Sequence, residues 1–503
     1  MMGAAPRTTG ESGPTPQCGG RHCAPDQQGA YDELMTQHQV DLAIIGAGSG
    51  NTLLTDYWDD KQVAIAEKGP FGGTCLNVGC IPTKMFVRPA ELARTPVEAQ
   101  RLNVSLPEGS ADWPAIRDRI FSRIDPIAQN GYEYRDQSPN VQVIAEEVTL
   151  DGTHGLRTAQ GTSISAEQLV IAAGSRAVIP DIEGCDLPGV HTSDTVMRLE
   201  RLPERIVIVG GGFIACEFAA IFSGLGSRTT QLIRRQHLMR HMDTEIRDAF
   251  NAEAPKYWNV ERNTETQRIT KNADGTLEVH TSTGTHTADI VLVATGRKPN
   301  TDLIGAQQAG LDLHQDGRLV VDEYQRVLRG GQPVPGLYAL GDICSTEQLK
   351  HVANYEARVV AHNLQHPHAL RANSNRAVPA AVFTHPELAQ IGLTEQEAVQ
   401  RIGRQNVSTK TQMVGGTAYG WALEDQTGLF KVVADRRDGS ILGAHVMGYQ
   451  ASNLIQPSVM AMNLGIDAYT AARGQYWIHP ALMEVTENAL LGLDVPQGQD
   501  APL

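Results

Sequence analysis

Cysteine is scarce in this sequence, with seven residues among 503. So low a content excludes the disulfide-rich scaffold of a small secreted protein and favours a reducing, cytoplasmic location. No cysteine follows Cys344, so thiol chemistry is excluded from the C-terminal part of the chain. Against this background, two cysteines only five positions apart, Cys75 and Cys80, are the feature that needs an explanation.

Long apolar runs and an excess of positive charge are also missing. No stretch of about eighteen apolar residues occurs, so the sequence predicts no membrane-spanning helix and no membrane partner. The formal net charge of −15 argues against nonspecific nucleic-acid binding, because such binding requires a basic surface. A hydrophobic content of 41% and a length sufficient for about three domains predict a globular, multidomain protein.

The first 38 residues lack hydrophobic periodicity and are rich in Gly, Pro, Thr and Gln, which predicts a disordered tail over residues 1–38. They also lack the apolar core of a secretory signal. Cys18 and Cys23 repeat the spacing of the central pair within this tail. Because no flanking structure is predicted to hold them, we interpret these two cysteines as incidental.

The stretch Gly72–Lys84 contains the central cysteines and the residues expected to shape the backbone between them. Five residues of an undistorted helix rise about 7.5 Å, which exceeds the ~7 Å Cα separation that a disulfide can close. Gly79 and Pro82 are expected to relax the backbone. Lys84 follows Cys80 by four residues and shares its helical face, where a cation favours the thiolate. The pattern predicts a redox-active pair; a purely structural cysteine pair is the alternative.

A glycine-rich turn follows the first predicted strand, residues 40–45. Gly46 permits a tight turn, and Gly48 lets the pyrophosphate of a dinucleotide approach the backbone at a helix N-terminus. The third glycine of the usual fingerprint is missing, because Asn51 stands in its place. The next predicted strand ends in Glu67, where a carboxylate accepts the hydroxyls of an adenosine ribose. We expect a dinucleotide here; an ordinary glycine turn is the alternative.

A second fingerprint, GGGFIA over residues 210–215, follows another apolar strand and has the G-x-G-x-x-A form. The acid expected at the end of the next strand is missing, and arginines stand there instead. Guanidinium groups match a ribose 2′-phosphate by bidentate hydrogen bonds, whereas the alternative is a solvated basic patch. Opposite charges at the two ribose positions imply FAD at the first site and NADPH at the second. The candidate NADPH residues are Gly210, Gly212, Ala215, Arg234, Arg235, Arg240 and Gly296.

Two similar strand-to-glycine junctions, at residues 169–174 and 290–296, bracket the second fingerprint, as if one domain were interrupted by an inserted neighbour. A further buried strand, residues 337–342, ends in an acid that either accepts hydrogen bonds from the cofactor's sugar alcohol or belongs to a simple turn. The candidate FAD residues are Gly46, Gly48, Gly50, Glu67, Lys84, Gly174 and Asp342. We expect an FAD domain over residues 39–178 and 290–375, an NADPH domain over 179–289 and a third domain over 376–503.

The third domain shows a different pattern. Strands are predicted at 378–384, 430–434 and 441–447, and helices at 394–401 and 452–464. His479 precedes Pro480, which keeps His479 out of the helical region and can itself begin a helix. Glu484 then lies about one turn along, able to accept the imidazole N–H and fix its tautomer. This predicts an acid–base pair, with a simple helix start as the alternative. The predicted fold class is α/β, with two Rossmann-like domains and a C-terminal α+β domain.

Together, GGTCLNVGCIPTK, the strand-ending Gly341-Asp342 and HPALxE resemble the class I flavoprotein disulfide reductases, and the similarity extends from residue 39 to the C-terminus. Within this family, the members that reduce mycothione are most similar, through GSGN after the first strand, CIPTKMFV and GQYWIHPAL. The resemblance implies FAD and NADPH as cofactors and a low-molecular-weight, mycothione-like disulfide as substrate. It also implies that the C-terminal domain forms a homodimer.

The resemblance implies a role for each motif residue. Cys80 is expected to be the thiolate beside the flavin, and Cys75 the interchange thiol that attacks the substrate disulfide. Lys84 is expected near flavin N5, paired with Glu217. By the same resemblance, the histidine of the acid–base pair protonates the departing thiol and comes from the partner subunit, so the active site is shared between two chains.

Catalytic candidates are therefore Cys75, Cys80, Lys84, Glu217, His479 and Glu484. Other members of the family remain alternatives, namely glutathione reductase, which shares the arginines, and dihydrolipoamide dehydrogenase, which prefers NAD. A more remote alternative, from another class, is a flavin-binding redox sensor without turnover.

Overall fold

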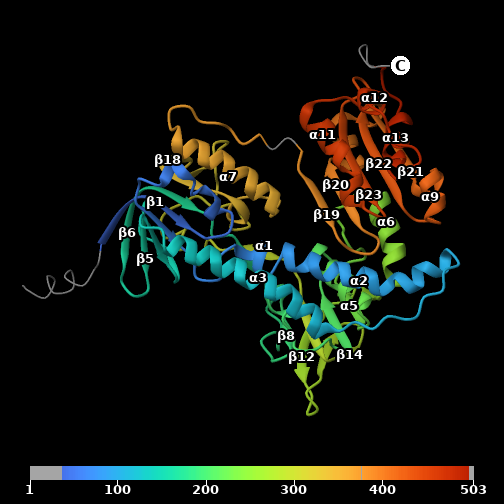
Figure 1. Ribbon diagram of the computed structural model, residues 1–503, viewed down its shortest axis with the longest axis horizontal. Helices are drawn as coiled ribbons and strands as arrows, with labels where there is room; N and C mark the ends of the chain where they lie inside the picture. Colours follow the sequence, from blue (N-terminus) through green and yellow to red (C-terminus); the bar gives the residue numbers. More distant parts are fainter. Residues whose placement is uncertain (1–36, 375–376, 498–503) are drawn as a thin grey trace, which may run out of the picture.

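The computed structural model describes residues 37–374 and 377–497 and arranges them in three domains (Figure 1). The first domain lies at the left of the view, the second below, and the third, built from the C-terminal part of the chain, at the upper right. The tail expected over residues 1–38 lies outside the described residues, apart from Gln37 and His38, which belong to the first strand. No helix within the described ranges is long and apolar enough to cross a membrane.

The first domain is built on a mixed sheet with a parallel centre. Its strands are ordered β17 (Arg326–Arg329), β18 (Gln332–Ala339), β6 (Ser163–Ile171), β1 (Gln37–Ile45), β2 (Val63–Ala66) and β3 (Val141–Ile144), and β4 (Val148–Leu150) and β5 (Gly155–Thr158) form a hairpin beside β6. β1 pairs in parallel with β2 and β6, and β18 pairs in parallel with β6. Apolar side chains are buried on both faces of this sheet, which explains the continuous apolar runs.

The connection after β1 is a pair of short 3-10 helices, η2 (Gly50–Leu53) and η3 (Asp56–Trp58), and not the expected helix. Asn51, at the position of the missing glycine, accepts a hydrogen bond at Oδ1 from Arg135 Nε at 2.8 Å. The same guanidinium donates to two backbone carbonyls of this connection. In the usual fingerprint this connection is a longer helix. Here it is short and irregular, and an arginine from α3 (Trp113–Asp136) fixes it by hydrogen bonds.

The second domain has its own parallel sheet, and it extends past the boundary expected at residue 290. Its order is β11 (Asn259–Arg262), β10 (Arg228–Ile233), β9 (Arg205–Val209), β15 (Ile290–Val293) and β8 (Val190–His191), with an antiparallel sheet of β12 (Thr266–Lys271), β13 (Leu277–Thr281) and β14 (Thr285–Ala288). Because β15 lies between β9 and β8, it belongs to this domain and not, as expected, to the first. The chain returns in β16 (Arg297–Pro299), antiparallel to the outgoing β7 (Ser175–Ala177).

The third domain is an antiparallel sheet with helices, as expected. The strand order is β19 (Pro379–Val382), β20 (Leu388–Gly392), β23 (Ile441–Met447), β22 (Leu429–Asp435) and β21 (Val407–Met413). The helices are α8 (Glu395–Ile402), α9 (Ala418–Ala422), α10 (Ala451–Leu454), α11 (Gln456–Leu464), α12 (Ala468–Arg473) and α13 (Glu484–Leu491). The single helix expected over 452–464 is divided into α10 and α11, because a new helix starts with Pro457 in its first turn, where proline is tolerated.

Two long helices, α2 (Cys80–Arg101) and α3, connect the first two domains by packing with α5 (Phe213–Gly224) of the second domain. A fourth long helix, α7 (Lys350–Gln365), packs on the first domain, and the shorter helices are α1 (Gly73–Asn77), α4 (Ser193–Val196) and α6 (Thr244–Glu253). Phe86 of α2 stacks on Trp113 at 4.8 Å between ring centroids, and Trp113 stacks on Phe222 of α5 at 5.5 Å. All three rings are fully buried in one hydrophobic core. The helix that begins at Cys80 is thereby anchored against the second domain.

Candidate active site

The two cysteines lie on either side of a helix break. Cys75 belongs to α1, which ends at Asn77, and Cys80 is the first residue of α2. Gly79 makes the break, with φ −134° and ψ −123°, and a Cβ at this position would lie 2.8 Å from the Thr74 carbonyl oxygen. Pro82 lies in the first turn of α2, where backbone N–H groups have no partner within the helix, so the proline costs no helical hydrogen bond. The glycine alone therefore relaxes the backbone as expected.

The surroundings of the two thiols shift their pKa values in opposite directions. The Cys75 thiol donates a hydrogen bond to the Cys80 sulfur, and together with the nearby charge of Lys84 this lowers the pKa of Cys80 to about 7. The same hydrogen bond and partial burial raise the pKa of Cys75. Both cysteines are free thiols in this structure. Cys80 is therefore the better thiolate of the pair, which supports the roles implied by the resemblance.

The expected partner of Lys84 is also in place. Lys84 Nζ lies 2.7 and 2.8 Å from the two carboxylate oxygens of Glu217, which is buried on α5. Glu217 Oε1 also accepts the backbone N–H of Phe383 at 2.9 Å, and Lys84 Nζ lies 4.5 Å from the centre of the Phe383 ring. All three domains therefore meet at this ion pair, directly beside the thiols.

The first glycine turn has the backbone shape that a dinucleotide requires. Gly46 has φ +104°, and a Cβ there would collide with the carbonyl oxygen of Ala172 at the end of β6. Glu67 Oε2 accepts the backbone N–H of Ala47 at 2.9 Å, so the expected ribose carboxylate lies against this turn. A Cβ on Gly73, at the start of α1, would lie 2.8 Å from Gly48 Cα. The turn and the redox helix are thus in backbone contact.

The remaining FAD candidates surround a second polar cluster. Asp342 Oδ2 accepts a hydrogen bond from Ser175 Oγ at 2.6 Å, and Ser175 Oγ in turn accepts one from Arg297 Nε at 2.8 Å. Gly174 has φ +66° and borders open space, whereas Gly50 packs against the side chains of Ile44 in β1 and of Ala172, directly after β6. Among the described residues, a hydrogen bond therefore holds Oδ2 of Asp342 and none is made at Oδ1. These residues fit the sugar-alcohol part of FAD.

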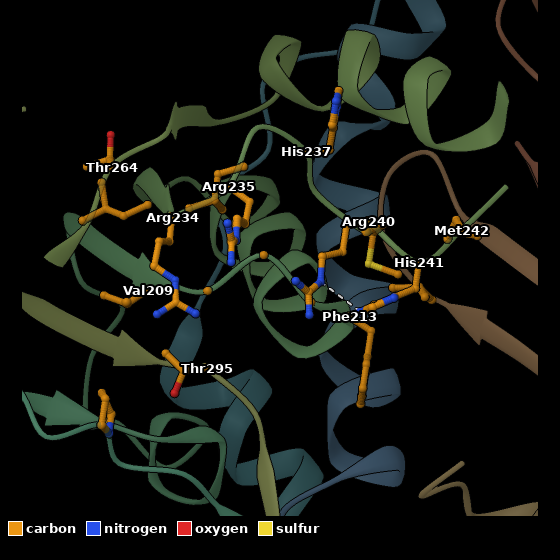
Figure 2. Close-up of a pocket in the computed structure, with 18 of the residues that line it drawn as sticks. Val209, Phe213, Arg234, Arg235, His237, Arg240, His241, Met242, Thr264 and Thr295 are labelled. Atoms are coloured by element: carbon orange, nitrogen blue, oxygen red, sulfur yellow. Dashed lines mark hydrogen bonds between the residues drawn. The ribbon is translucent and has the colours of Figure 1, made fainter. Parts of the chain in front are cut away.

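The second glycine turn opens into a cavity of about 570 Å³ (Figure 2). Gly210 repeats the geometry of Gly46, with φ +136° and a Cβ position that collides with the Ala294 carbonyl at the end of β15. Gly210 and Gly212 line the cavity, whereas Ala215 is buried behind the turn and Gly296 follows the lining residue Thr295.

The three arginines expected at the NADPH site also line this cavity. Arg234, Arg235 and Arg240 all line it and are exposed, and within the described ranges none of them has a carboxylate at ion-pair distance. Figure 2 shows the three guanidinium groups around the same space. An unpaired cluster of this kind fits the 2′-phosphate of NADPH. His237 and His241 line the same cavity, and neither was identified from the sequence as a binding residue. The position of His241 directly after Arg240 was the one available signal.

His479 and Glu484 form the expected pair, but the local backbone differs. His479 Nδ1 lies 2.5 Å from Glu484 Oε1, with 70% of the histidine side chain exposed and 14% of the glutamate. Helix α13 begins at Glu484, and not at Pro480, because residues 480–483 form a turn and Glu484 Oε2 accepts the Ala481 N–H. The imidazole is therefore oriented at Nδ1 and presents Nε2 outward.

Lys350 is a functional candidate that the sequence did not reveal. It begins α7, and its Nζ donates to Ser49 Oγ in the first glycine turn at 2.9 Å. Its positive charge acts to lower the pKa of Cys75, although burial and the Cys80 contact outweigh it. Lys350 is 275 positions from Cys75, so no local motif connects them. A separate cavity of about 820 Å³ is lined by Cys80 but not by Cys75, and also by Lys84, Arg88, Arg119 and Arg123 among others.

Comparison with known proteins identifies the family. The family described as "Pyridine nucleotide-disulphide oxidoreductase" matches residues 40–357, and its dimerisation domain matches residues 378–490. The chain belongs to this family. Membership makes the protein an oxidoreductase with FAD and a pyridine nucleotide as cofactors, and the residues above fit both groups.

Individual relatives of this oxidoreductase are similar over nearly their whole length. Mycothione reductase of Mycobacterium tuberculosis is 49% identical over 462 residues, covering 90% of this chain and 99% of the relative. Glutathione reductase of Burkholderia cepacia is 32% identical, covering 90% and 98%. Among solved structures, the HOCl-induced flavoprotein disulfide reductase RclA from Escherichia coli superposes with a TM-score of 0.78 at 26% identity, covering 90% and 99%.

Proposed function

We propose that this oxidoreductase uses NADPH to reduce mycothione to two molecules of mycothiol through a redox-active Cys75–Cys80 pair. The observation that carries the substrate is the 49% identity to a mycothione reductase over 90% of this chain. The reaction class is supported independently by the thiol pair, the Lys84–Glu217 ion pair and the oriented histidine.

The choice of NADPH rests on charge. The end of β10 carries Arg234 where an NAD site places an acid, and Arg235 and Arg240 line the same cavity. FAD is assigned to the first glycine turn, where Glu67 and Asp342 supply the carboxylates for its ribose and sugar alcohol. When bound, the flavin supplies a two-electron relay between the nicotinamide and the cysteine pair.

The cysteines then carry out two exchanges. His479 takes the proton of the Cys75 thiol, the resulting thiolate attacks one sulfur of the substrate disulfide to form a mixed disulfide, and His479 returns the proton to the first thiolate that is expelled. Cys80, whose pKa of about 7 leaves a large fraction as thiolate at neutral pH, next attacks Cys75, expels the second thiolate and closes the Cys75–Cys80 bond. Two electrons and a proton from NADPH reopen this bond as one thiol and one thiolate, and one proton from solvent neutralises the second released thiolate. One disulfide, one NADPH and one proton therefore give two thiols and NADP⁺.

The proton donor is His479 because its other nitrogen is held by Glu484 at 2.5 Å. A positioned general acid of this kind typically contributes about 10²–10⁴ in rate. The large exposure of His479 and the match to a dimerisation domain support a homodimer in which His479 of one chain serves the thiols of the other.

The deciding experiment measures NADPH oxidation with mycothione, glutathione disulfide, lipoamide and mercuric ion in parallel, and repeats each assay with NADH. We expect mycothione with NADPH to give the largest kcat/KM. A preference for glutathione disulfide would make the protein a glutathione reductase, and a preference for lipoamide with NADH a dihydrolipoamide dehydrogenase. NADPH oxidation with none of the four would favour a flavin-binding sensor without turnover.

A further inference from the structure

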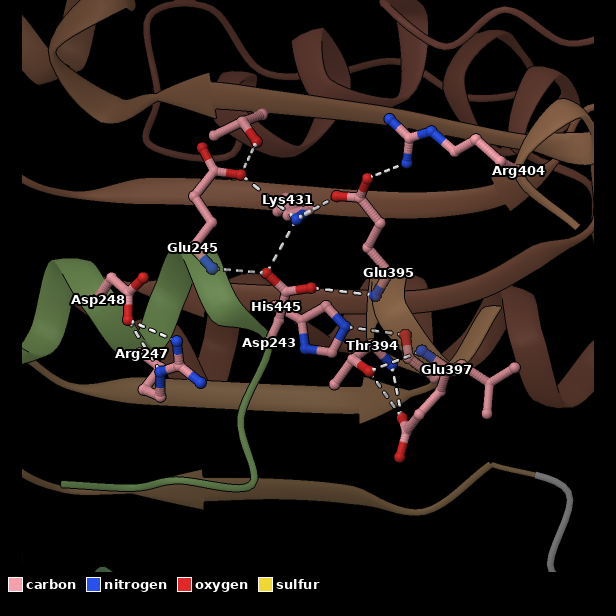
Figure 3. A network of polar contacts seen from close by, with 12 residues as sticks. Asp243, Glu245, Arg247, Asp248, Thr394, Glu395, Glu397, Arg404, Lys431 and His445 are labelled. Atoms are coloured by element: carbon pink, nitrogen blue, oxygen red, sulfur yellow. Dashed lines mark hydrogen bonds and ion pairs between the residues drawn. The ribbon is translucent and has the colours of Figure 1, made fainter. Parts of the chain in front are cut away.

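A buried ion network joins the second domain to the third (Figure 3). At its centre is Lys431 on β22, whose side chain is 3% exposed. Lys431 Nζ lies 2.9 Å from Asp243 Oδ1 and 2.7 Å from Glu395 Oε2, with Glu245 Oε2 at 3.4 Å. Asp243 comes from the second domain and is 0% exposed, so this contact excludes water.

The Asp243 carboxylate is fixed by three interactions. Its Oδ1 accepts the Glu245 N–H at 3.1 Å and so caps α6, in addition to its contact with Lys431. Its Oδ2 accepts the Glu395 N–H at 3.0 Å, which is the first N–H of α8 in the third domain. Both carboxylate oxygens of Asp243 therefore accept hydrogen bonds, Oδ1 from both domains and Oδ2 from the third domain. Without Lys431, the buried Asp243 carboxylate would have no counter-ion, whereas Glu395 would keep its ion pair with Arg404.

The segment that ends at Asp243 forms one wall of the nucleotide cavity. Residues 239–242 line the cavity and directly precede Asp243. At the other end of this segment, the Met239 N–H bonds to the carbonyl of Gly211 in the second glycine turn at 2.9 Å. Arg240 therefore lies in a five-residue loop that is pinned at the fingerprint and at the ion network. A shift at Asp243 has to be absorbed within this loop, because Met239 is held.

We propose that Lys431 is a positioning residue for the 2′-phosphate end of NADPH. Through Asp243 it holds the loop of residues 239–243, and with it Arg240, at the edge of the cavity. Lys431 does not line the cavity and acts only through Asp243. The inference rests on the proposed function, which places NADPH in this cavity, and it gives a C-terminal-domain residue a part in nucleotide selection.

The test compares two probes that differ by one phosphate, adenosine 2′,5′-bisphosphate and AMP, by titration calorimetry on the purified flavoprotein. For Lys431→Met we expect the bisphosphate to bind about three- to tenfold more weakly, with AMP affinity within about twofold of the unaltered protein. The matched control is Arg437→Gln, which removes an ion pair to Asp435 at the end of the same strand and leaves the loop untouched. This control should preserve both affinities.

A second variant keeps the test decisive if Lys431→Met fails to fold. Asp243→Asn preserves the size of the capping side chain but removes the charge that Lys431 contacts, and it should give the same selective loss. Equal weakening of both probes, or no weakening, in a folded variant would overturn the inference. Failure of the unaltered protein to favour the bisphosphate over AMP would instead count against the NADPH site itself, so the two failures are distinguishable.

Discussion

Cys75 and Cys80 have the same side chain but opposite tendencies to ionise, and the difference comes from their neighbours. Cys80 accepts the hydrogen bond between the two thiols and faces the Lys84 cation, so its anion is stabilised. Cys75 is the donor in that bond and is partly buried, so its thiol form is favoured. In the reduced enzyme one negative charge is therefore held on the sulfur nearer the lysine. The attacking sulfur becomes nucleophilic only when a proton is removed from it.

Replacing Cys75 with alanine tests this assignment of charge. Without the donor thiol, the pKa of Cys80 should rise from about 7 toward the ordinary value of 9.0. Less thiolate is then present at pH 7, and because the remaining thiolate is intrinsically more nucleophilic, the alkylation rate should fall only about three- to tenfold. Peptide-resolved iodoacetamide labelling of the reduced protein between pH 5 and 10 measures this midpoint. Cys185→Ala, which removes another half-buried thiol, should leave the midpoint unchanged.

Residues that act within a local motif could be predicted from the sequence, and residues that act across space could not. The spacing of Cys75, Cys80 and Lys84, and that of His479 and Glu484, carries their chemistry because each group lies within one short stretch of consecutive residues. Lys431 and Asp243 are separated by 188 positions. Each has ordinary neighbours, so only the packing of two domains reveals that they form an ion pair.

At the scale of elements, the two glycine turns are the same structure used twice. In each turn the first glycine has a positive φ and packs against a carbonyl at the end of the adjacent parallel strand, Ala172 after β6 and Ala294 after β15. The elements after the two turns differ, since the first turn continues into short 3-10 helices and the second into α5. The ribose end also differs, with Glu67 at one turn and Arg234 at the other.

Matched substitutions in these turns should separate the two cofactors. Gly46→Ala places a Cβ against the Ala172 carbonyl, so we expect loss of bound flavin and a colourless protein. Gly210→Ala makes the equivalent collision with Ala294, and we expect a yellow protein whose flavin NADPH no longer reduces. Both are measured from the flavin absorbance in the visible region before and after addition of NADPH.

Gly226→Ala is the control for these two variants, because Gly226 has φ +108° but open space around its Cβ position. Backbone strain alone should lower its free energy of unfolding by about 1–2 kcal/mol and spare both cofactors. If Gly46→Ala retained flavin at the unaltered level, the assignment of FAD to the first turn would be wrong.

The positions of the most apolar strands were predicted, but strands such as β20 and β21, and the sheet to which each strand belongs, were not. Residues 290–293 form a short apolar strand that is indistinguishable in composition from the strands of the first domain. Only its pairing with β9 and β8 places it in the second domain. Similarly, Pro480 is compatible with a helix start, yet the helix begins at Glu484 because the carboxylate of that residue is bonded to His479 and to the Ala481 N–H.

At the scale of the whole molecule, the segment around His479, the proposed general acid, is exposed to solvent in the single chain. Tyr476 and Ile478 are 102% and 76% exposed, and they flank Trp477, which packs into the core of the third domain. Leu76, next to Cys75, packs instead on the core shared by α2 and α5. The thiols and the histidine therefore belong to different packing units of one chain. An exposed apolar segment beside a catalytic side chain is best explained by a second copy that covers it.

Mixing two inactive variants tests whether the active site is shared between chains. Cys80→Ala lacks the thiolate, and His479→Ala lacks the general acid while still allowing NADPH to reduce its flavin. In a mixed dimer with a shared site, one of the two sites combines the intact cysteine pair of one chain with the intact histidine of the other. Because random reassociation makes about half the dimers mixed, the mixture should recover about a quarter of the unaltered activity.

A site built within one chain gives a different result, because every site then lacks one of the two groups and no activity returns at any mixing ratio. Reassociation itself is checked independently by giving the two variants different affinity tags and purifying the doubly tagged dimer. That dimer should have about half the activity per flavin, since one of its two sites is intact. An inactive doubly tagged dimer would show that His479 acts on the cysteines of its own chain.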